Sequence, residues 1–385
     1  MSRSLAVIAG VAAGGLALVI IGLLFLWFYI FKSRALSSKT SETGSSDPST
    51  LVEWNRGGQM SSTGCGPSGD QQSLRQFTLQ ELELAAKNFN DSNYVGKGTF
   101  GLVYKGLLLD GTLVAIKRRL GYPMQEFVEE VRYLSKIWHR NLVTLIGYCQ
   151  EGGCQVLVYE YMPNGSISSH LYDTRRDSTV RLEFKQRLSI AIGAAKGLSH
   201  LHRLVPPVIH KGFKTSNVLV DENFVAKVAD TGMVKLLQKI EDGDPSQTSE
   251  SNVFSDPEIP NLEELREASD VYSFGVFLLE LVTGREVAQL ISHESAGSLA
   301  QWVEEHMSLN DFIDHRLAGS FTSGGMKRLI RLILQCLDLS GRRRPKMEFI
   351  ASELDQILET EMTLTIVMGD GTAIVTLGSQ LFTSS

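Results

Sequence analysis

The sequence predicts an α+β domain of two lobes that follows a single membrane-spanning helix. An uncharged apolar block at residues 5–31 predicts the membrane helix. Downstream of residue 89, short β-branched runs alternate with turn residues, which is typical of strands. From about Glu183 onward, apolar residues recur at helical spacing, as in residues 185–204. A strand-rich part followed by a helix-rich part along the chain indicates an α+β arrangement.

The apolar block contains 27 consecutive residues without a charge, residues 5–31. A helix of that length reaches about 40 Å, which exceeds the ~30 Å hydrocarbon core of a bilayer. Residues 27–29 are aromatic and are followed by Lys32 and Arg34, an order that a membrane interface favours. The alternative is a cleaved signal peptide, whose apolar region would extend over only about 7–15 residues. We therefore expect an uncleaved transmembrane helix.

Charge alone leaves the orientation of this helix open, because Arg3 and the amino terminus nearly match Lys32 and Arg34. Gly10 and Gly14 form a GxxxG pattern, which would let the helices of a dimer approach closely. The alternative is that both glycines are ordinary small residues in an apolar helix.

Residues 32–76 are predicted to form a disordered juxtamembrane linker. Within residues 33–73, 23 of 41 residues are serine, threonine, glycine or proline. Such a composition cannot bury enough surface to fold. The serines are candidate phosphorylation sites, and a plain spacer fits the composition equally well. We expect residues 1–4 to be a short extracellular end with no room for a ligand site.

The predicted folded domain begins at Phe77. Thr78 and Glu81 have the spacing of a helix capping box, and apolar residues follow at helical spacing. This pattern predicts a short helix near residues 79–89 at the start of the domain.

A glycine-rich motif follows. Gly96, Gly98 and Gly101 with Val103 match GxGxxGxV, in which glycines let the backbone fold closely over phosphates. The same pattern in a dinucleotide-binding turn would open a helix. Here residues 102–117 read as strand, Asp-Gly turn and strand, and they end in Val-Ala-Ile-Lys. The continuation therefore favours a phosphate-covering hairpin.

Spaced motifs between Phe77 and Leu358 resemble those of plant receptor-like protein kinases of the serine/threonine type. They are FTLQELELAAKNF (77–89), HRNLVTLIGYC (139–149), LVYEYMPNGSI (157–167), SDVYSFGVFLLELVTGRE (269–286) and GRRRPKM (341–347). The resemblance implies a bilobal protein-kinase fold over residues 77–358, with a β-rich N-lobe to about residue 163 and an α-helical C-lobe after it. Since kinases use cytosolic ATP, it also implies a single-pass plasma-membrane protein whose kinase-like domain lies in the cytosol.

The resemblance assigns roles to individual residues. Lys117 would neutralise the α- and β-phosphates of ATP and pair with Glu130. Asp270 would brace the catalytic loop, and Glu258 would pair with Arg344. The residues implied to bind nucleotide, with Tyr159 as gatekeeper and Glu160 to Met162 as hinge, are Gly96, Lys97, Gly98, Gly101, Val103, Ala115, Lys117, Glu130, Tyr159, Glu160, Met162 and Leu219. Asn217 and Asp230 are implied to bind Mg²⁺.

The catalytic loop departs from the family pattern. Active members carry H-R-D-x-K-x-x-N, whereas this chain has His210-Lys-Gly-Phe-Lys-Thr-Ser-Asn217. Gly212 replaces the aspartate that accepts the proton of the substrate hydroxyl, and Lys211 replaces the arginine that reads activation-loop phosphate. A general base contributes about 10²–10⁴-fold to a rate. We therefore expect phosphoryl transfer to be greatly reduced, although Lys214 is retained.

Two further segments are altered. The D-F-G motif reads Asp230-Thr-Gly232, so the smaller and polar Thr231 replaces a phenylalanine that packs on the αC helix. Residues 250–254 replace a Gly-Thr-x-Gly-Tyr stretch that seats the substrate peptide. The nucleotide-contacting residues survive, which predicts binding of ATP and Mg²⁺ without efficient transfer. The alternative is that these residues only hold the fold, for instance as a plain ion pair between the lobes.

Three functions follow from this pattern. We favour a membrane-anchored receptor-like pseudokinase that binds ATP and acts as a signalling partner or allosteric regulator of active receptor kinases. The second is a weakly active serine/threonine protein kinase that transfers the ATP γ-phosphate to protein, because positioning and magnesium carry much of that reaction. The third is an inert tether or decoy that binds no nucleotide.

Composition excludes other classes of function. The net charge of −6, from 37 basic and 43 acidic residues, argues against a general nucleic-acid binder. Four cysteines in 385 residues exclude a disulfide-dense scaffold, and Cys149 and Cys154 alone are too few for a zinc site. In the tail at residues 359–385, two alternating β-type runs flank Gly369-Asp-Gly371, which predicts a hairpin or, failing that, a frayed end.

Overall fold

The computed structural model describes residues 74–119, 126–172, 182–233, 236, 253–259, 264–291, 298–306 and 313–368. The chain divides into Met1–Gly69 and Asp70–Ser385, and every described residue belongs to the second unit. The predicted membrane helix, the GxxxG pair and most of the linker lie outside the described residues. None of the helices in the described part of the chain combines the length and the apolar character that a membrane crossing requires.

A six-stranded sheet forms the N-lobe, with the strand order β1-β5-β6-β4-β3-β2. The strands are β1 (Arg75–Gln76), β2 (Tyr94–Lys97), β3 (Gly101–Leu107), β4 (Leu113–Arg119), β5 (Leu145–Glu151) and β6 (Cys154–Glu160). Neighbouring strands are antiparallel except β1, which pairs in parallel with β5. The hairpin of β3 and β4 at the glycine motif confirms the strand-turn-strand prediction, and Gly111 in its turn has a φ of 86°.

Each face of this sheet is covered by one helix. The predicted capping box is present at the start of α2 (Leu79–Ala85), where Thr78 and Glu81 bind each other's backbone N–H groups. Val156 and Val158 of β6 pack on the α2 side, whereas Leu157 and Tyr159 pack on the side of α3 (Phe127–Leu134). The alternation follows from the two-residue period of a strand.

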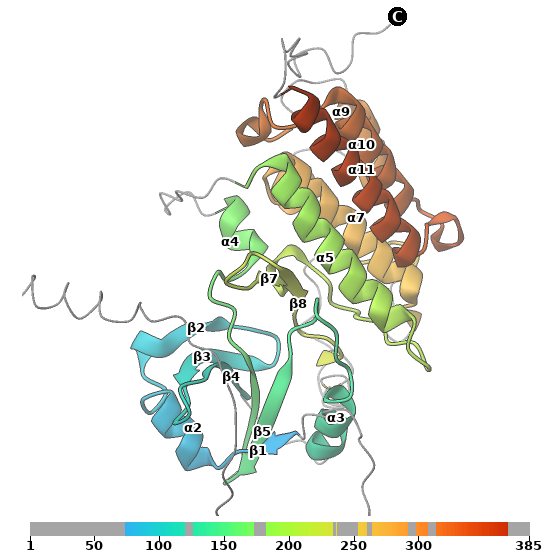
Figure 1. Cartoon of the computed structure of the whole chain (residues 1–385). Helices are drawn as coiled ribbons and strands as arrows, with labels where there is room; N and C mark the ends of the chain where they lie inside the picture. Colours follow the sequence, from blue (N-terminus) through green and yellow to red (C-terminus); the bar gives the residue numbers. More distant parts are fainter. Residues whose placement is uncertain are drawn as a thin grey trace, which may run out of the picture. The chain divides into compact units, whose positions relative to one another are not determined.

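The C-lobe is helical, apart from a short hairpin. Its helices are α4 (Ile167–Tyr172), α5 (Phe184–His202), α7 (Glu267–Thr283), α8 (Val287–Ile291), α9 (Leu299–His306), α10 (Ser323–Cys336) and α11 (Met347–Met368), and its hairpin is β7 (Val218–Val220) with β8 (Ala226–Val228). Single 3₁₀ turns are η1 (Asp91–Asn93) in the N-lobe and η2 (Thr215–Asn217), η5 (His315–Leu317) and η6 (Gly341–Arg343) in the C-lobe. Helices α5, α7, α10 and α11 lie alongside one another around one apolar core (Figure 1).

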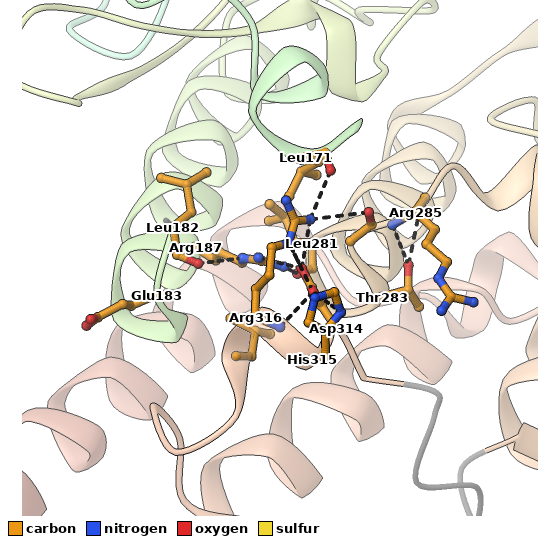
Figure 2. Close-up of polar contacts among 12 residues, drawn as sticks. Leu171, Leu182, Glu183, Arg187, Leu281, Thr283, Arg285, Asp314, His315 and Arg316 are labelled. Carbon is orange, nitrogen blue, oxygen red and sulfur yellow. Dashed lines mark hydrogen bonds and ion pairs between the residues drawn. The ribbon is translucent and has the colours of Figure 1, made fainter. Parts of the chain in front are cut away.

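A buried charge network joins the ends of four C-lobe elements (Figure 2). Arg187 of α5 pairs with Asp314 at 2.6 Å and donates to the carbonyl oxygens of Leu182 and Leu281. Arg316 binds the same carboxylate and also donates to the carbonyl oxygen of Leu171, at the end of α4. We call Arg187, Asp314 and Arg316 the Arg187 network. It satisfies carbonyl groups at the ends of α4 and α7 that a helix leaves without partners.

The C-terminal hairpin prediction is wrong in its first arm. Residues 362–368 continue helix α11, which extends to Met368. Glu361 anchors this part of the helix, because its buried carboxylate accepts hydrogen bonds from the N–H and hydroxyl of Thr322 at the start of α10. Tertiary packing therefore overrides the local β-type pattern. Residues 369–385 lie outside the described residues.

Candidate nucleotide site and catalytic loop

The glycine-rich segment forms a tight turn between β2 and β3. The N–H of Gly98 donates to the carbonyl oxygen of Gly101 at 2.8 Å. Gly101 has a φ of 152°, and a Cβ there would clash with the carbonyl oxygen of Arg118, so the fold itself requires glycine. A Cβ on Gly96 would have nothing within 4 Å, and one on Gly98 would meet only Val103 at 3.8 Å and Gly101 at 3.9 Å. Glycine at 96 and 98 therefore leaves room along the turn for phosphates.

Lys117 of β4 faces the C-lobe across this turn. Its ammonium group forms an ion pair with the carboxylate of Asp230, and both side chains are nearly buried. The same ammonium lies 5.1 Å from the ring centroid of Tyr159. Thr99 at the tip of the turn donates to the other oxygen of Asp230 at 3.4 Å. Lys117 and Asp230 thus connect the two lobes.

The predicted pairing of Lys117 with Glu130 is not the one observed, because the Lys117 ammonium binds Asp230 instead. Glu130 lies on α3 and is buried, with 8 % of its surface exposed. After Asp230 the chain places Met233 and Leu236 in the cluster that packs against α3. Both side chains are fully buried among apolar residues, while the hydroxyl of Thr231 is buried without a hydrogen-bond partner among the described residues.

The ionisation of Asp230 is favoured by its surroundings. Burial disfavours the charged carboxylate, but Lys117, His210 and Lys214 outweigh it and hold the pKa of Asp230 below its usual range. Burial, with the charge of Asp230, also raises the pKa of the Tyr159 phenol well above its usual range. Asp230 is therefore an anion at neutral pH, as a metal ligand must be.

The hinge between the lobes is held by an ion pair that sequence analysis missed. Lys227 of β8 binds both carboxylate oxygens of Glu160, at 2.9 and 2.7 Å, and the N–H of Thr144 donates to one of them at 2.7 Å. The Glu160 side chain is thereby engaged within the protein. A base bound at the hinge would be read by main-chain atoms of Glu160 to Met162.

Apolar side chains flank the space beneath the glycine turn. Val103 of β3 and Ala115 of β4 are half-buried in the N-lobe sheet. Leu219 of β7 is half-buried in the C-lobe, where it forms an isolated bridge to Ser166 beyond the hinge. Lys97 at the end of β2 is exposed. β4 pairs with β3 and with β6, which leads into the hinge, and the Ser166–Leu219 bridge joins β7 to the segment after the hinge.

The catalytic loop is held through its main chain. Asp270 of α7 accepts hydrogen bonds from the N–H groups of His210 and Lys211, at 2.8 and 3.0 Å, and also contacts His202 at 2.8 Å. The Asn217 amide donates to the carbonyl oxygen of Gly212 at 2.9 Å. At Gly212 there is no side chain to accept or orient a proton. The loop is thus held by bonds to its main chain, to which position 212 contributes only a carbonyl oxygen.

Arg344 pairs with a different carboxylate from the predicted one. Its guanidinium binds Asp256 in a bidentate ion pair with contacts of 2.7 and 2.8 Å, and both side chains are fully buried. The exposed Glu258 instead accepts the N–H of Gly341 at 2.7 Å. Arg344 holds the pKa of Asp256 below its usual range although burial opposes ionisation. The two acids lie two residues apart, and only tertiary packing decides which one faces Arg344.

The residues present fit a magnesium–nucleotide complex. Mg²⁺ is commonly held by one or two protein oxygens together with phosphates and water, and Asp230 and Asn217 supply such oxygens near Lys117 and the glycine turn. No cluster of three or more histidine, cysteine, aspartate or glutamate side chains suited to a metal ion occurs among the described residues.

Comparison with known proteins agrees with this geometry. Residues 89–354 match the family model described as protein tyrosine and serine/threonine kinase. This chain therefore belongs to the protein kinase family. It is 36 % identical over 371 residues to the receptor-like protein kinase ANXUR1 and 39 % identical over 302 residues to the receptor-like protein kinase THESEUS 1, both of Arabidopsis thaliana.

These alignments cover 91 % and 76 % of this chain, but only 43 % of ANXUR1 and 35 % of THESEUS 1. The chain thus spans about two fifths of the length of the curated relatives it matches. Among solved structures, it is similar to the pseudokinase domain of BIR2, described as an immune regulator of the RLK/Pelle family. That match has a TM-score of 0.60 and 30 % identity, and covers 74 % of this chain and 86 % of the BIR2 chain.

Proposed function

We propose that this chain is a membrane-anchored receptor-like pseudokinase that binds ATP with Mg²⁺ and acts by binding active receptor kinases as a signalling partner or allosteric regulator. The proposal rests on the structure of the catalytic loop. Asp270 and Asn217 hold its backbone, yet Gly212 offers no group to accept the proton of a substrate hydroxyl. The similarity to a domain named a pseudokinase supports the same reading.

Retained residues support nucleotide binding. On binding, Lys117 would turn from Asp230 toward the phosphates, and Asp230 with Asn217 would be free to hold the metal ion. Lys97, Val103, Ala115, Tyr159, Met162 and Leu219 would enclose the nucleotide from the two lobes. Bound ATP would supply a transferable phosphoryl group, but Gly212 could not deprotonate an acceptor. We expect Glu130 and Glu160 to shape the site from α3 and the hinge.

The uncharged run at residues 5–31 supports the membrane anchor. In this proposal the linker connects it to the kinase-like domain on the cytosolic side of the plasma membrane; the predicted end of the linker at residue 76 is too late, because Arg75 and Gln76 already pair with β5. A dimer through Gly10 and Gly14 would be compatible with this arrangement. Protease protection of the full chain in sealed vesicles tests the topology, since a cytosolic domain would be cleaved only from the cytosolic face.

Restoring an aspartate at position 212 tests the observation on which the proposal rests, namely that Gly212 has no side chain to accept a proton. We expect the purified full chain to transfer phosphate from ATP to protein at a barely detectable rate, and Gly212→Asp to raise it by about 10²–10⁴-fold. Transfer at the ordinary rate of a kinase by the wild-type chain would overturn the proposal. If Gly212→Asp stays inactive, the changes at Thr231 and residues 250–254 contribute to the defect as well.

Nucleotide binding is tested separately by thermal unfolding with ATP and MgCl₂. A ligand that binds only the folded state stabilises it, by about 2.7 kcal/mol at a hundredfold excess over Kd. We expect the melting temperature to rise for the wild type and for the exposed control Lys346→Met, but not for Lys117→Met. No shift at millimolar ATP would instead identify an inert tether.

The alternative is a weakly active serine/threonine kinase. It is favoured by Lys214, which is retained and lies close enough to Asp230 to contribute to lowering its pKa. Transfer that vanishes in both Lys117→Met and Lys214→Met would support it. Transfer that survives both substitutions would come from a contaminating kinase.

A further inference from the structure

An exposed tryptophan sits among cations on the loop that follows α3. Residues 131–150 contain three cations, Arg132, Lys136 and Arg140, and no acidic residue, although the whole chain carries a net charge of −6. The structure exposes all three cations, and 65 % of the Trp138 surface is exposed. We call Arg132, Lys136, Trp138 and Arg140 the Trp138 surface.

The three cations of this surface have no ionic partner in the part of the chain that the structure describes. Other exposed cations nearby do: Lys196 pairs with Asp355 at 3.0 Å, and Arg203 contacts Glu348 at 3.8 Å. Positive charge also acts on His139. Burial lowers the pKa of its imidazole, and His200 and Arg140 lower it further. The Trp138 surface therefore carries a net positive charge that nothing described neutralises.

A groove of about 580 Å³ adjoins this surface. Arg140 and His139 line one end of it, and α5 and α11 form its walls. The rings of His139 and His200 stack within it at a centroid distance of 4.8 Å. Two ion pairs, Lys196–Asp355 and Arg203–Glu348, join its α5 and α11 walls. Glu359 adds a carboxylate to the α11 wall, while the Arg140 end is cationic.

We infer that the Trp138 surface docks an acidic segment of a partner protein, whose chain continues into the groove between α5 and α11. This inference rests on the proposed function as a binding protein and names the surface that would bind. Tryptophan and arginine dominate the energy of protein interfaces, and unpaired cations attract and orient an acidic partner. The concave groove, with Glu348, Asp355 and Glu359 on its α11 wall, fits a polypeptide better than a flat anionic bilayer.

The test uses the full chain in neutral nanodiscs and a random 12-residue phage-displayed peptide library as the probe. We expect selection to enrich peptides that combine glutamate or aspartate with an aromatic or leucine residue. Binding of the enriched peptides, made synthetically with a fluorophore, should weaken at least tenfold on Trp138→Ala and on the triple reversal Arg132→Glu, Lys136→Glu, Arg140→Glu. All of these positions are exposed, so melting temperatures should stay unchanged.

A matched control separates site binding from general charge. The triple reversal Arg331→Glu, Arg342→Glu, Lys346→Glu makes the same change in net charge at exposed cations that line no part of the groove, and it should leave binding within twofold of wild type. Enrichment of non-acidic peptides, or equal loss in both triple variants, would overturn the inference.

Two further outcomes would also overturn the inference, because each would show that something other than an acidic segment of a partner protein binds the Trp138 surface. A dimer of the full chain that dissociates on the Trp138-surface reversal would identify a second copy. Protection of residues 132–140 from hydrogen exchange that appears only in nanodiscs containing phosphatidylserine would identify the membrane. None of these measurements uses ATP, so a failure of nucleotide binding or of the Gly212→Asp reversion would be recognised independently.

Discussion

The Arg187 network and the catalytic loop are both polar regions of the C-lobe, but a fully buried arginine–carboxylate ion pair lies at the centre of only the first. In the Arg187 network, charged side chains bind one another, and Arg187 and Asp314 each keep only 3 % of their side chain exposed. In the catalytic loop, the side chains of Asp270 and Asn217 bind main-chain groups, including the carbonyl oxygen of Gly212. The loop therefore keeps its shape without any side chain at position 212.

This difference is consistent with the proposal that the chain retains a kinase fold without the proton acceptor at position 212. Removing Arg187 would leave the buried Asp314 carboxylate with only the partly exposed Arg316 as an arginine partner, which is costly. Removing the side chain at position 212 leaves every main-chain hydrogen bond of the loop in place. We therefore expect a substitution in the Arg187 network to cost more stability than a substitution at position 212.

The largest expected effect is therefore in the Arg187 network. We expect Arg187→Ala to lower the free energy of unfolding by about 3–5 kcal/mol, because Asp314 loses its buried partner and two carbonyl oxygens lose a donor. Urea denaturation followed by circular dichroism measures it. The control Arg328→Ala breaks a partly exposed pair with Glu353 and should cost at most about 1 kcal/mol. Equal losses in the two variants would contradict the comparison.

We expect the second-largest loss of stability from a substitution at Asp270, whose side chain supports the catalytic loop. Asp270 accepts two main-chain N–H groups on different oxygens, so Asp270→Asn would turn an amide N–H₂ toward one of them. We expect a loss of about 1–3 kcal/mol in the free energy of unfolding. Faster hydrogen exchange at residues 210–212 would show that the loss lies in the loop. Unchanged exchange there would mean that Asp270 does not hold the loop.

Lowering the pH should reduce the contribution of the Arg187 network to the free energy of unfolding, because Asp314 becomes protonated. Burial opposes ionisation of Asp314, but Arg187 and Arg316 outweigh it and hold its pKa below the usual range. The folded-state pKa thus lies below the unfolded value of about 3.9. Its contribution to stability is present above that value and is lost as pH falls toward the folded-state pKa.

Unfolding free energies between pH 3 and pH 6 would measure this loss. We expect the wild type to lose more stability on acidification than Asp314→Asn, which has no proton to bind at this position. Other acids such as Asp230 and Asp256 titrate in both proteins, so the difference between the two curves isolates Asp314. Parallel curves would mean that Asp314 does not titrate below its unfolded value.

Local sequence signals predicted the elements whose causes are local. The capping box of Thr78 and Glu81 and the hairpin at the glycine motif depend on residues a few positions apart, and both are confirmed. The two lobes follow from the change of hydrophobic period near Glu183, because burial on a strand and on a helix repeats differently.

Partners of the buried charges could not be predicted in the same way. For Lys117 the sequence predicted Glu130, but its ammonium binds Asp230, which lies 113 residues further along the chain. For Arg344 the sequence predicted Glu258, but the guanidinium binds Asp256, two residues earlier in the chain. Lys227 gave no signal at all, because only the folding of β8 against the hinge brings it to Glu160.

We expect the smallest loss of stability from a substitution at Gly212. It tests most directly whether the catalytic loop keeps its shape independently of the side chain at that position. The residue of the catalytic loop with a left-handed conformation is Lys211, with a φ of 63°, so Gly212 does not supply an unusual backbone conformation. We expect Gly212→Ala to change the free energy of unfolding by no more than about 0.5 kcal/mol. Gly101→Ala, where a Cβ would clash with the carbonyl oxygen of Arg118, should cost about 1–3 kcal/mol.

Thermal unfolding of the two alanine variants side by side distinguishes two reasons for a glycine. If Gly212→Ala is as damaging as Gly101→Ala, the backbone at position 212 needs glycine, and an aspartate could not be restored there without distorting the loop. An inactive Gly212→Asp protein would then say nothing about the missing base. If Gly212→Ala is neutral, the loop can carry a side chain, and any activity that Gly212→Asp gains measures what the missing carboxylate contributes to phosphoryl transfer.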